Sequence, residues 1–580
     1  MFDKGPDSER FSSYHVKKNK YFNGLMFKSR RILILFFFSL SVLFLLAKLS
    51  TFQFSGYKKF TDLAIGQQNR VFRIESWRGT IYDRFMEPLA INLDAKSIFS
   101  DPRFLEDKES AASFLSDVLE IKKDILLDKF NRENAFVWIK RKVTDEQAQA
   151  VENMKIPGIY FVTESKRSYF NENMASHVIG FVNVDNKGLE GLEKVYEDNL
   201  GGTPGWRHIV RDAKRRTVLI KEKESVPAKN GSNIVLTVDS VIQYIVEEEL
   251  DRMVKKFNPG KASVVVMDPF TGQILALANF PNYNLNEFNK TPKEFFKNTS
   301  ISDVYEPGSV FKIVTASAAL DEGVVALEDK FFCENGEYRV GGRILHDFHR
   351  YGRLSFQDII VKSSNIGTVK IAEKLGKKRV FEAVKKFGFG SKTGIELPGE
   401  VAGISRHYSK WSKSDITTIP IGQGIAVTPL QLASAVSVIA NGGFLMKPYV
   451  VEKITTWQGD VYKEFSPECK GRVLKKETCD KMKEVLYRVV SEGTGKRANS
   501  KKYKVCGKTG TAQKVNPSGG YYENKYNATF IGFAPKERPV LSIVVTASDP
   551  HPVYFGGSVA GPTFKNIAER TLEYLKTVHK

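Results

Sequence analysis

The residues best suited to covalent chemistry are Ser309 and Lys312, which lie three positions apart. A Glu-Pro-Gly turn precedes Ser309, and the stretch 309–320 has the apolar composition of a helix, so we expect Ser309 at a helix N-terminus with Lys312 one turn later. A serine hydroxyl is a weak nucleophile until a base takes its proton, and lysine acts as that base only when neutral. Burial, a second cation and the helix dipole each lower a lysine pKa. The pair therefore predicts acyl transfer.

The S-x-x-K spacing is a weak signal by itself, because Ser55 and Lys58 match it equally well. That second copy has no helix-like stretch behind it. Taken alone, Ser309 would be better explained as a helix N-cap and Lys312 as a solvated charge. The assignment therefore depends on further motifs.

Two further motifs follow Ser309 along the chain. Ser-Ser-Asn at 363–365 comes after a predicted helix, and Lys-Thr-Gly-Thr at 508–511 lies in a predicted strand of mostly small residues. The order S-x-x-K, S-x-N, K-T-G is the signature of penicillin-recognising serine acyltransferases. The candidate site residues are Ser309, Lys312, Ser363, Asn365, Lys508, Thr509, Gly510 and Thr511.

Three other patterns resemble sites but are interpreted differently. A second Lys-Thr-Gly at 392–394 lies in a turn-rich segment without a strand to line a cleft, so it is rejected. His346 and His349, with Cys333 upstream, match no zinc spacing, and we interpret them as polar loop residues while their binding of a metal stays open. Cys506 is expected to be a buried structural thiol despite its closeness to Lys508. No metal or cofactor is predicted.

The composition indicates a folded protein with an anionic partner. Apolar residues make up 42% and charged residues 26% of the 580, which excludes wholesale disorder. The formal charge is +21, but the basic residues are spread along the chain without an aromatic-interleaved stripe, so nucleic acid is not expected. An anionic membrane surface or cell-wall polymer is the better partner. Cys469 and Cys479 either pair in an oxidising compartment or stay as thiols, and the sequence leaves both open.

One segment near the N-terminus is apolar enough to enter a membrane. The uncharged run 32–47 spans about 24 Å as a helix, and its apolar character continues to residue 54, so we predict a spanning anchor at 32–54. No A-x-A-like cleavage site follows, which argues against a removed signal peptide. The basic residues before the run predict a cytoplasmic N-terminus; they are Lys17, Lys18, Lys20, Lys28, Arg30 and Arg31.

Beyond the anchor the pattern predicts two domains, with a boundary near residue 231 where a loop signal precedes a strand. Two strand hairpins, 262–278 and 528–547, enclose a mostly helical middle, and a helix at 563–575 follows them. Thr428, Pro429 and Gln431 predict a capping box for another helix, which Gly442 ends. In the preceding domain, the glycine and adjacent opposite charges of 78–84 predict a strand that runs into a turn, and the alternative is that 78–84 and 188–193 are both only turns. The fold class is α+β.

With these motifs in place, the chain resembles the class B penicillin-binding proteins over nearly all of its length. The resemblance extends to RGTIYDR at 78–84, GLEGLE at 188–193 and the glycine pair at 556–557. It implies a transpeptidase domain with a central antiparallel sheet flanked by helices, an N-terminal pedestal domain and a single transmembrane helix. The implied domains are a cytoplasmic tail at 1–31, the anchor at 32–54, a dimerisation-like pedestal at 55–230 and the transpeptidase domain at 231–580.

The resemblance also implies a reaction. Ser309 would attack the penultimate D-Ala carbonyl of a donor stem peptide with Lys312 as base and Ser363 as proton relay, and an acceptor amine would resolve the acyl-enzyme. Asn365 would bind the donor peptide, the Lys-Thr-Gly-Thr strand at 508–511 would hold the substrate carboxylate, and the N–H groups of Ser309 and Thr511 would form the oxyanion hole. β-Lactams would acylate the same serine.

Within the class, the chain most resembles the septal, cell-division member. This resemblance implies a protein of the inner membrane whose catalytic domain lies in the periplasm. The implied partners are a separate glycan polymerase and other membrane proteins of the division machinery. An elongation-type transpeptidase, a β-lactamase and a β-lactam receptor or inactive scaffold are the alternatives. A β-lactamase needs a second base for its water, and a receptor usually has more membrane spans; the sequence indicates neither.

Overall fold

The computed structural model describes residues 9–55, 57–211, 217–220, 225–340 and 342–578. By contacts the chain forms two compact units, one of Met1–Ile74 with Pro204–Ala228 and the other of Glu75–Thr203 with Lys229–Lys580. The first eight positions of the predicted cytoplasmic tail lie outside the described residues, as does Gly56 within the second S-x-x-K match.

The first unit carries the predicted membrane segment. Helix α1 (Glu9–Ser50) continues through a π-helical turn at Thr51–Ser55, and helix α2 (Tyr57–Gln68) follows. The expectation that no helix lies behind the second S-x-x-K match is therefore wrong, because α2 contains Lys58. Within the described residues, Arg30–Phe54 is the one helix long and apolar enough to cross a membrane, with a mean hydropathy of 2.6 and none of that window buried. Three strands complete the unit as a sheet, in the order β1 (Asn69–Ile74), β6 (Gly205–Arg211) and β7 (Thr217–Ile220).

The centre of the second unit is a five-stranded antiparallel sheet. Its order is β10 (Ile274–Phe280), β9 (Lys261–Met267), β21 (Leu541–Ser548), β20 (Tyr521–Ala534) and β19 (Cys506–Val515). The predicted hairpins are therefore confirmed, and they meet where β9 pairs with β21, far apart in sequence. The strand that carries the K-T-G motif lies at the edge of this sheet.

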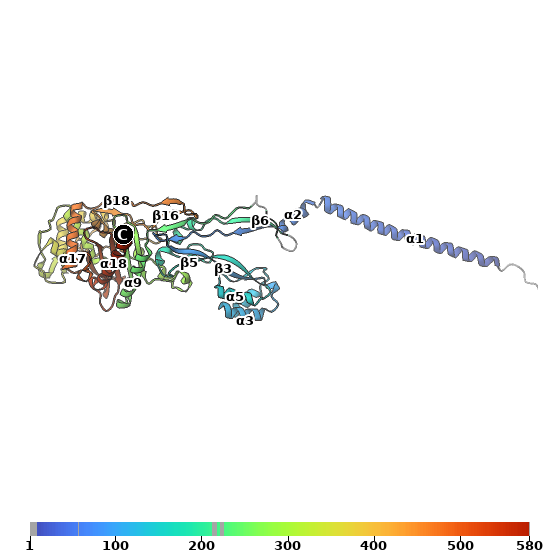
Figure 1. The fold of residues 1–580 in the computed structure, drawn as a ribbon, viewed down its shortest axis with the longest axis horizontal. Helices are drawn as coiled ribbons and strands as arrows, with labels where there is room; N and C mark the ends of the chain where they lie inside the picture. Colours follow the sequence, from blue (N-terminus) through green and yellow to red (C-terminus); the bar gives the residue numbers. More distant parts are fainter. Residues whose placement is uncertain (1–8, 56, 212–216, 221–224, 341, 579–580) are drawn as a thin grey trace, which may run out of the picture. The chain divides into compact units, whose positions relative to one another are not determined.

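Alternating side chains of the sheet enter two different cores, as the two-residue period of a strand requires. Val264 and Val266 pack with helices α9 (Ser240–Phe257) and α18 (Gly556–Val578), which lie together in Figure 1. Val265 and Met267 pack with the opposite core, which contains α11 (Lys312–Asp321) and α16 (Pro429–Ala440). The predicted α+β fold, a central antiparallel sheet flanked by helices, is confirmed.

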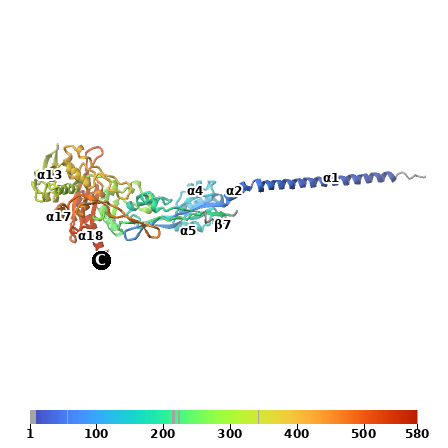
Figure 2. The same ribbon diagram turned by 90° about the horizontal axis from the view of Figure 1, so that it is seen from above.

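The remaining helices of this domain pack around the sheet, and α13, α17 and α18 group together in Figure 2. They are α10 (Thr299–Ser302), α12 (Phe356–Val361), α13 (Asn365–Leu375), α14 (Lys377–Lys386), α15 (Asp415–Thr418) and α17 (Lys476–Ser491). Three two-stranded sheets accompany them: β11 (Lys330–Phe332) with β14 (Arg353–Ser355), β12 (Glu337–Val340) with β13 (Arg343–His346), and β15 (Phe444–Met446) with β18 (Cys469–Arg472).

The local signals of α16 act as predicted. The Thr428 hydroxyl accepts from the Gln431 N–H at 3.2 Å, and the Gln431 side-chain oxygen accepts from the Thr428 N–H at 3.0 Å. Pro429 begins the helix and Asn441 caps its end, immediately before Gly442. By contrast, the C-terminal helix α18 is longer at both ends than its predicted range of 563–575 and continues through an internal proline.

A second sheet combines strands of the predicted pedestal, 55–230, with strands from the predicted transpeptidase domain. Its order is β17 (Val461–Glu464), β16 (Val451–Thr455), β8 (Asn233–Leu236), β2 (Ile81–Tyr82), β3 (Pro88–Ser100) and β4 (Val137–Lys140), with β5 (Ile159–Tyr169) also paired to β3. Helices α3 (Lys108–Leu119), α4 (Lys123–Phe130) and α5 (Asp145–Asn153) enclose a small separate core at one end of β3 (Figure 1). Three short helices follow β5: α6 (Ser176–Ile179), α7 (Gly191–Val195) and α8 (Glu197–Leu200).

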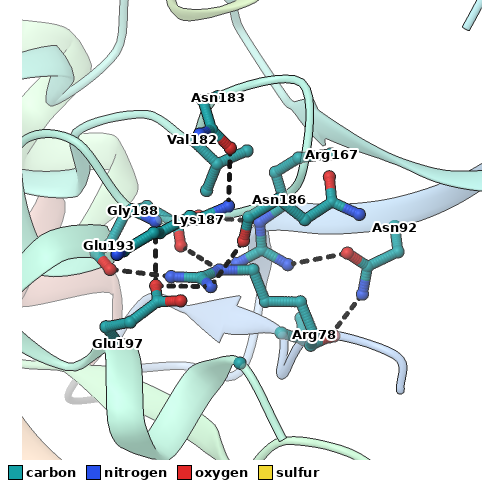
Figure 3. Close-up of polar contacts among 12 residues, drawn as sticks. Arg78, Asn92, Arg167, Val182, Asn183, Asn186, Lys187, Gly188, Glu193 and Glu197 are labelled. Atoms are coloured by element: carbon teal, nitrogen blue, oxygen red, sulfur yellow. Dashed lines mark hydrogen bonds and ion pairs between the residues drawn. The ribbon is translucent and has the colours of Figure 1, made fainter. Parts of the chain in front are cut away.

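The predicted strand within 78–84 is confirmed by β2, and a buried charge cluster joins this segment to 188–193 (Figure 3). The Glu193 carboxylate accepts from Arg78 Nε at 2.5 Å and from Arg167 Nε at 2.7 Å, and all three side chains are almost fully buried. Arg78 also pairs with Glu197 at 2.8 Å and donates to the Asn186 carbonyl at 2.9 Å. The cluster therefore joins the segment before β2 and strand β5 to helix α7.

Candidate functional site

Ser309 lies in a 3₁₀ turn, Gly308–Phe311, that leads directly into α11 at Lys312. The expected helix N-terminus is present, but its first turn is tighter than an α-helix. Gly308 has a φ of +59°, and a Cβ there would lie 3.1 Å from the Thr511 carbonyl oxygen. The glycine thus lets the nucleophile's turn approach the K-T-G strand closely.

Lys312 is fully buried, one turn after Ser309, and its side chain contacts the S-x-N motif. Its Nζ donates to the Ser363 carbonyl at 2.6 Å and to Asn365 Oδ1 at 2.8 Å, and it lies 3.3 Å from the Ser363 hydroxyl. Burial lowers the pKa of Lys312 to about 7, although the nearby charge of Asp347 acts in the opposite direction. A large neutral fraction near physiological pH is the condition for a lysine base.

Lys508, on strand β19, contacts the same hydroxyl of Ser363. Its Nζ donates to the Ser363 hydroxyl at 2.9 Å and to the Thr509 carbonyl at 3.0 Å, and its side chain is also fully buried. Burial, together with the charge of Lys312, holds the pKa of Lys508 well below its ordinary value. Two lysines from distant segments therefore converge on one hydroxyl.

Ser363 adopts a left-handed conformation, with a φ of 60°, in the short link between α12 and α13. A non-glycine residue pays for this conformation in backbone strain, and such residues concentrate at functional sites. Here the turn presents both the hydroxyl and the carbonyl of Ser363 to Lys312. The strained backbone of Ser363 therefore places both of these oxygens next to the Lys312 side chain.

Asp347 holds the S-x-N motif in place, and the sequence interpretation missed it. Its carboxylate accepts from the Ser364 hydroxyl at 2.6 Å, from the Asn365 N–H at 2.5 Å and from the Ile366 N–H at 3.1 Å. A carboxylate at the first turn of α13 is favoured by the helix dipole and satisfies free N–H groups. The sequence shows Asp347 in the His-Asp-x-His segment. The Ser-Ser-Asn motif that it contacts is 16 to 18 residues away, and no local sequence pattern connects the two.

The K-T-G strand packs directly against the nucleophile's turn. A Cβ on Gly510 would lie 2.9 Å from the Pro307 carbonyl oxygen and 2.9 Å from Val310 Cγ1, so only glycine fits there. The hydroxyl of Thr511 accepts from the Gly556 N–H at 3.0 Å, and that of Thr509 lies 2.9 Å from the Thr494 hydroxyl. These contacts fix the two threonines along the strand.

The second K-T-G copy lacks a strand, as predicted. Residues 392–394 lie in a loop without strand pairing, where Glu400 accepts from the N–H and hydroxyl of Thr393. His346 is the last residue of strand β13, so its prediction as a loop residue is wrong, whereas His349 lies outside the helices and strands. Across the part of the chain that the structure describes, no group of three or more potential ligands could hold a metal ion. Cys506 is fully buried, as predicted, and Cys469 and Cys479 are free thiols.

Hydrogen bonds join Lys312, Ser363, Asn365 and Lys508 into one cluster, next to which the turn of Ser309 and the strand 509–511 pack together. A serine backed by a buried lysine of low pKa, with a second hydroxyl that can relay a proton, is equipped for nucleophilic acyl transfer. All eight predicted site residues therefore lie in the same region of the second unit.

Two family models match the chain. Residues 262–569 match the model described as "Penicillin binding protein transpeptidase domain", and residues 73–236 match the one described as "Penicillin-binding Protein dimerisation domain". Together they account for most of the chain outside the first unit's helices.

Named relatives cover most of the chain. It is 35% identical to stage V sporulation protein D of Bacillus subtilis, over 94% of this chain and 86% of that protein. It is 33% identical to peptidoglycan D,D-transpeptidase FtsI of Escherichia coli K12, over 86% of this chain and 84% of that protein. Among solved structures, apo penicillin-binding protein 3 of Mycobacterium tuberculosis superposes with a TM-score of 0.68 at 27% identity, over 87% of this chain and 97% of that one.

Proposed function

The chain belongs to the class B penicillin-binding proteins, and we propose that it cross-links peptidoglycan stem peptides through a Ser309 acyl-enzyme during septal wall synthesis. It is a serine-type D,D-transpeptidase by its domain and its relatives. The observation that carries the proposed site is the convergence of Lys312 and Lys508 on the Ser363 hydroxyl beside the turn of Ser309.

In the acylation step, neutral Lys312 takes the proton of Ser309 as its Oγ attacks the penultimate D-Ala carbonyl of the donor. The N–H groups of Ser309 and Thr511 hold the negative oxygen of the tetrahedral intermediate, an effect of about 2.7 to 4 kcal/mol per donor. The close packing of Gly308 on the Thr511 backbone supports this role. The carbon–nitrogen bond then breaks, and terminal D-Ala leaves after receiving a proton through Ser363.

Substrate binding is assigned to the two motifs that flank the nucleophile. Asn365 binds the donor peptide, and Lys508, Thr509, Gly510 and Thr511 hold its terminal carboxylate. A carboxylate bound near Lys508 would raise the pKa of that lysine, since an opposite charge favours the charged form. In the second step an amine of the acceptor stem attacks the Ser309 ester, which forms the cross-link and frees the serine. β-Lactams acylate Ser309 by the first step alone.

The proposed organisation follows the membrane segment. The basic residues that precede position 32 support a cytoplasmic tail at 1–31, an anchor at 32–54 and a periplasmic remainder, with a pedestal at 55–230 and a transpeptidase domain at 231–580. This arrangement places the enzyme in the inner membrane. A separate glycan polymerase and other division proteins are the proposed partners, because the two matching family models describe a transpeptidase domain and a dimerisation domain.

Reconstituted cross-linking tests the activity. The full-length protein is combined with a glycan polymerase and lipid-linked precursor, and the digested product is separated to detect dimeric muropeptides. We expect dimers with the native chain and none with Ser309→Ala. In cells depleted of the native protein, filaments with unfinished septa would support the septal role. Loss of rod shape without a division block would instead indicate an elongation enzyme, and division sustained by Ser309→Ala would indicate a scaffold.

A further inference from the structure

Positive charge concentrates in the segment 370–415 of the second unit. This segment holds eleven Lys and Arg residues against five Asp and Glu residues, which is more than a quarter of the formal charge of +21 in fewer than a tenth of the residues. They are distributed over helices and connecting turns, so only the fold shows which of them share a surface. A surface of one charge sign attracts partners of the opposite sign.

A cluster of aromatic rings brings two parts of this segment together. Between ring centroids, Phe381 of helix α14 lies 4.8 Å from His407, 5.7 Å from Tyr408 and 6.3 Å from Trp411. Trp411 is buried, and its indole N–H donates to the Arg406 carbonyl at 2.9 Å. The stretch 407–411 is therefore packed against one side of α14.

Five exposed lysines surround these rings, and we call them the α14 face. Three of them are on α14, three or four positions from Phe381 and thus on its side of the helix, and two follow Tyr408. The five are Lys377, Lys378, Lys385, Lys410 and Lys413. Lys377 and Lys413 line the same cavity of about 420 Å³, next to Trp411. Folding therefore brings lysines 36 residues apart to one recess.

The α14 face is poorly neutralised by its own chain. Among the residues that the structure describes, Lys377, Lys410 and Lys413 have no ion pair. Lys378 lies 4.0 Å from Glu382, at the outer limit of a salt bridge, and Lys385 donates only to carbonyl oxygens, at 3.3 and 3.4 Å. These ammonium groups are available to anions that arrive from outside.

The surroundings of the α14 face favour a polymer over a membrane surface. A helix that lies on a membrane inserts a row of large apolar side chains. Within 370–415, all of which the structure describes, Ile404 is the one large apolar side chain that is exposed. The five cations are all lysines, which act as point charges and lack the planar guanidinium that binds phosphate in a bidentate manner. Lysines suit carboxylates whose positions vary along a flexible chain.

Helix α13 separates the α14 face from the reaction centre. It begins at Asn365, which contacts Lys312, and it ends at Leu375, two residues before α14 begins. At about 1.5 Å per residue, α13 carries the chain about 15 Å away from the site. A polymer on the α14 face therefore leaves Ser309 free to react.

We propose that the α14 face is an exosite for polymerised peptidoglycan, which it binds through the free carboxylates of the stem peptides. The inference rests on the proposed function, because that function places the domain next to a polymer of this kind. It adds a binding surface outside the three motifs. The face holds the enzyme on existing wall while Ser309 processes a separate stem peptide.

The test uses fluorescein-labelled, uncross-linked glycan strands that carry stem peptides with free carboxylates. Fluorescence anisotropy measures their Kd for the full-length protein in nonionic detergent, after penicillin has acylated Ser309 so that the active site does not contribute. Added salt should weaken the binding, because exposed charges are screened. Strands with amidated carboxylates, or without stem peptides, should bind about tenfold more weakly, the value of two exposed ion pairs.

Two double variants of α14 and its neighbour assign the binding to one face. Lys377→Gln with Lys413→Gln should raise the Kd for free-carboxylate strands about tenfold, or about threefold for each exposed ion pair. The matched control is Arg379→Gln with Lys386→Gln, which removes the same charge from the other side of α14, where both cations line a small cavity with acidic residues. It should raise the Kd less than about twofold. Native rates of penicillin acylation show that each variant is folded.

Equal weakening by the two double variants would overturn the proposal, since only net charge would then matter. Undiminished binding of the amidated strands would overturn it as well. If strands do not bind, and phosphatidylglycerol vesicles bind through Lys377 and Lys413, the α14 face belongs to a membrane contact and the proposal is wrong. Failure of the proposed function has a different signature, because penicillin would not acylate Ser309 whether or not strands bind.

Discussion

The Nζ atoms of Lys312 and Lys508 both hydrogen-bond the Ser363 hydroxyl, at 3.3 and 2.9 Å. Both lysines are fully buried and come from segments almost 200 residues apart. Two positive charges this close in a buried site disfavour each other, which keeps a proton acceptor available next to the nucleophile. Ser363 connects them and is positioned to pass a proton from one to the other.

The rate of Ser309 acylation should rise with pH through about 7, because the pKa of Lys312 lies there and only its neutral form accepts a proton. Below that pH the lysine is charged and acylation slows about tenfold per pH unit, and above it the rate reaches a plateau. The second-order rate constant for a fluorescent penicillin, measured from pH 5 to 9, checks this. A flat profile over the range would contradict the role of Lys312.

Replacing Asp347 by alanine should lower the acylation rate and shift its pH profile. The carboxylate raises the pKa of Lys312, so its removal should move the inflection below that of the native protein. Loss of the contacts to Ser364 and Asn365 should cost about 1 to 2 kcal/mol of stability, as for a helix cap.

The matched control for this change is Asp128→Ala, at an exposed position of α4. It should keep both the native rate and the native inflection. A purely structural role for Asp347 would reduce the rate without moving the inflection, so an unshifted profile would refute its electrostatic effect on Lys312.

Replacing Glu193 by glutamine should destabilise the pedestal. The change leaves Arg78 and Arg167 buried without their shared carboxylate, and loss of one partner from a buried ion pair typically costs about 3 to 5 kcal/mol. Glu197→Gln removes a pair whose acid is 31% exposed and should cost clearly less. Urea unfolding followed by tryptophan fluorescence compares the two; equal midpoints for Glu193→Gln and the native chain would show that the cluster is not stabilising.

The catalytic motifs, the two strand hairpins and the capped helix α16 were predictable because each depends on neighbouring residues. The K-T-G copy at 392–394 was correctly rejected for lack of a strand. Asp347 and the partnership of Arg78 with Glu193 were not predictable, since they join residues that only the folded chain brings together. The left-handed turn at Ser363 was also missed, because serine has no marked preference for that conformation.

The central claim is that Ser309 becomes acylated, and mass spectrometry of the penicillin-treated protein tests it most directly. After digestion, the account predicts one peptide heavier by the mass of the drug, with fragment ions that place the addition on Ser309. The same treatment of Ser309→Ala should leave that peptide unmodified. An adduct on another residue, such as Ser55 or Ser363, or no adduct on a folded protein, would contradict the account.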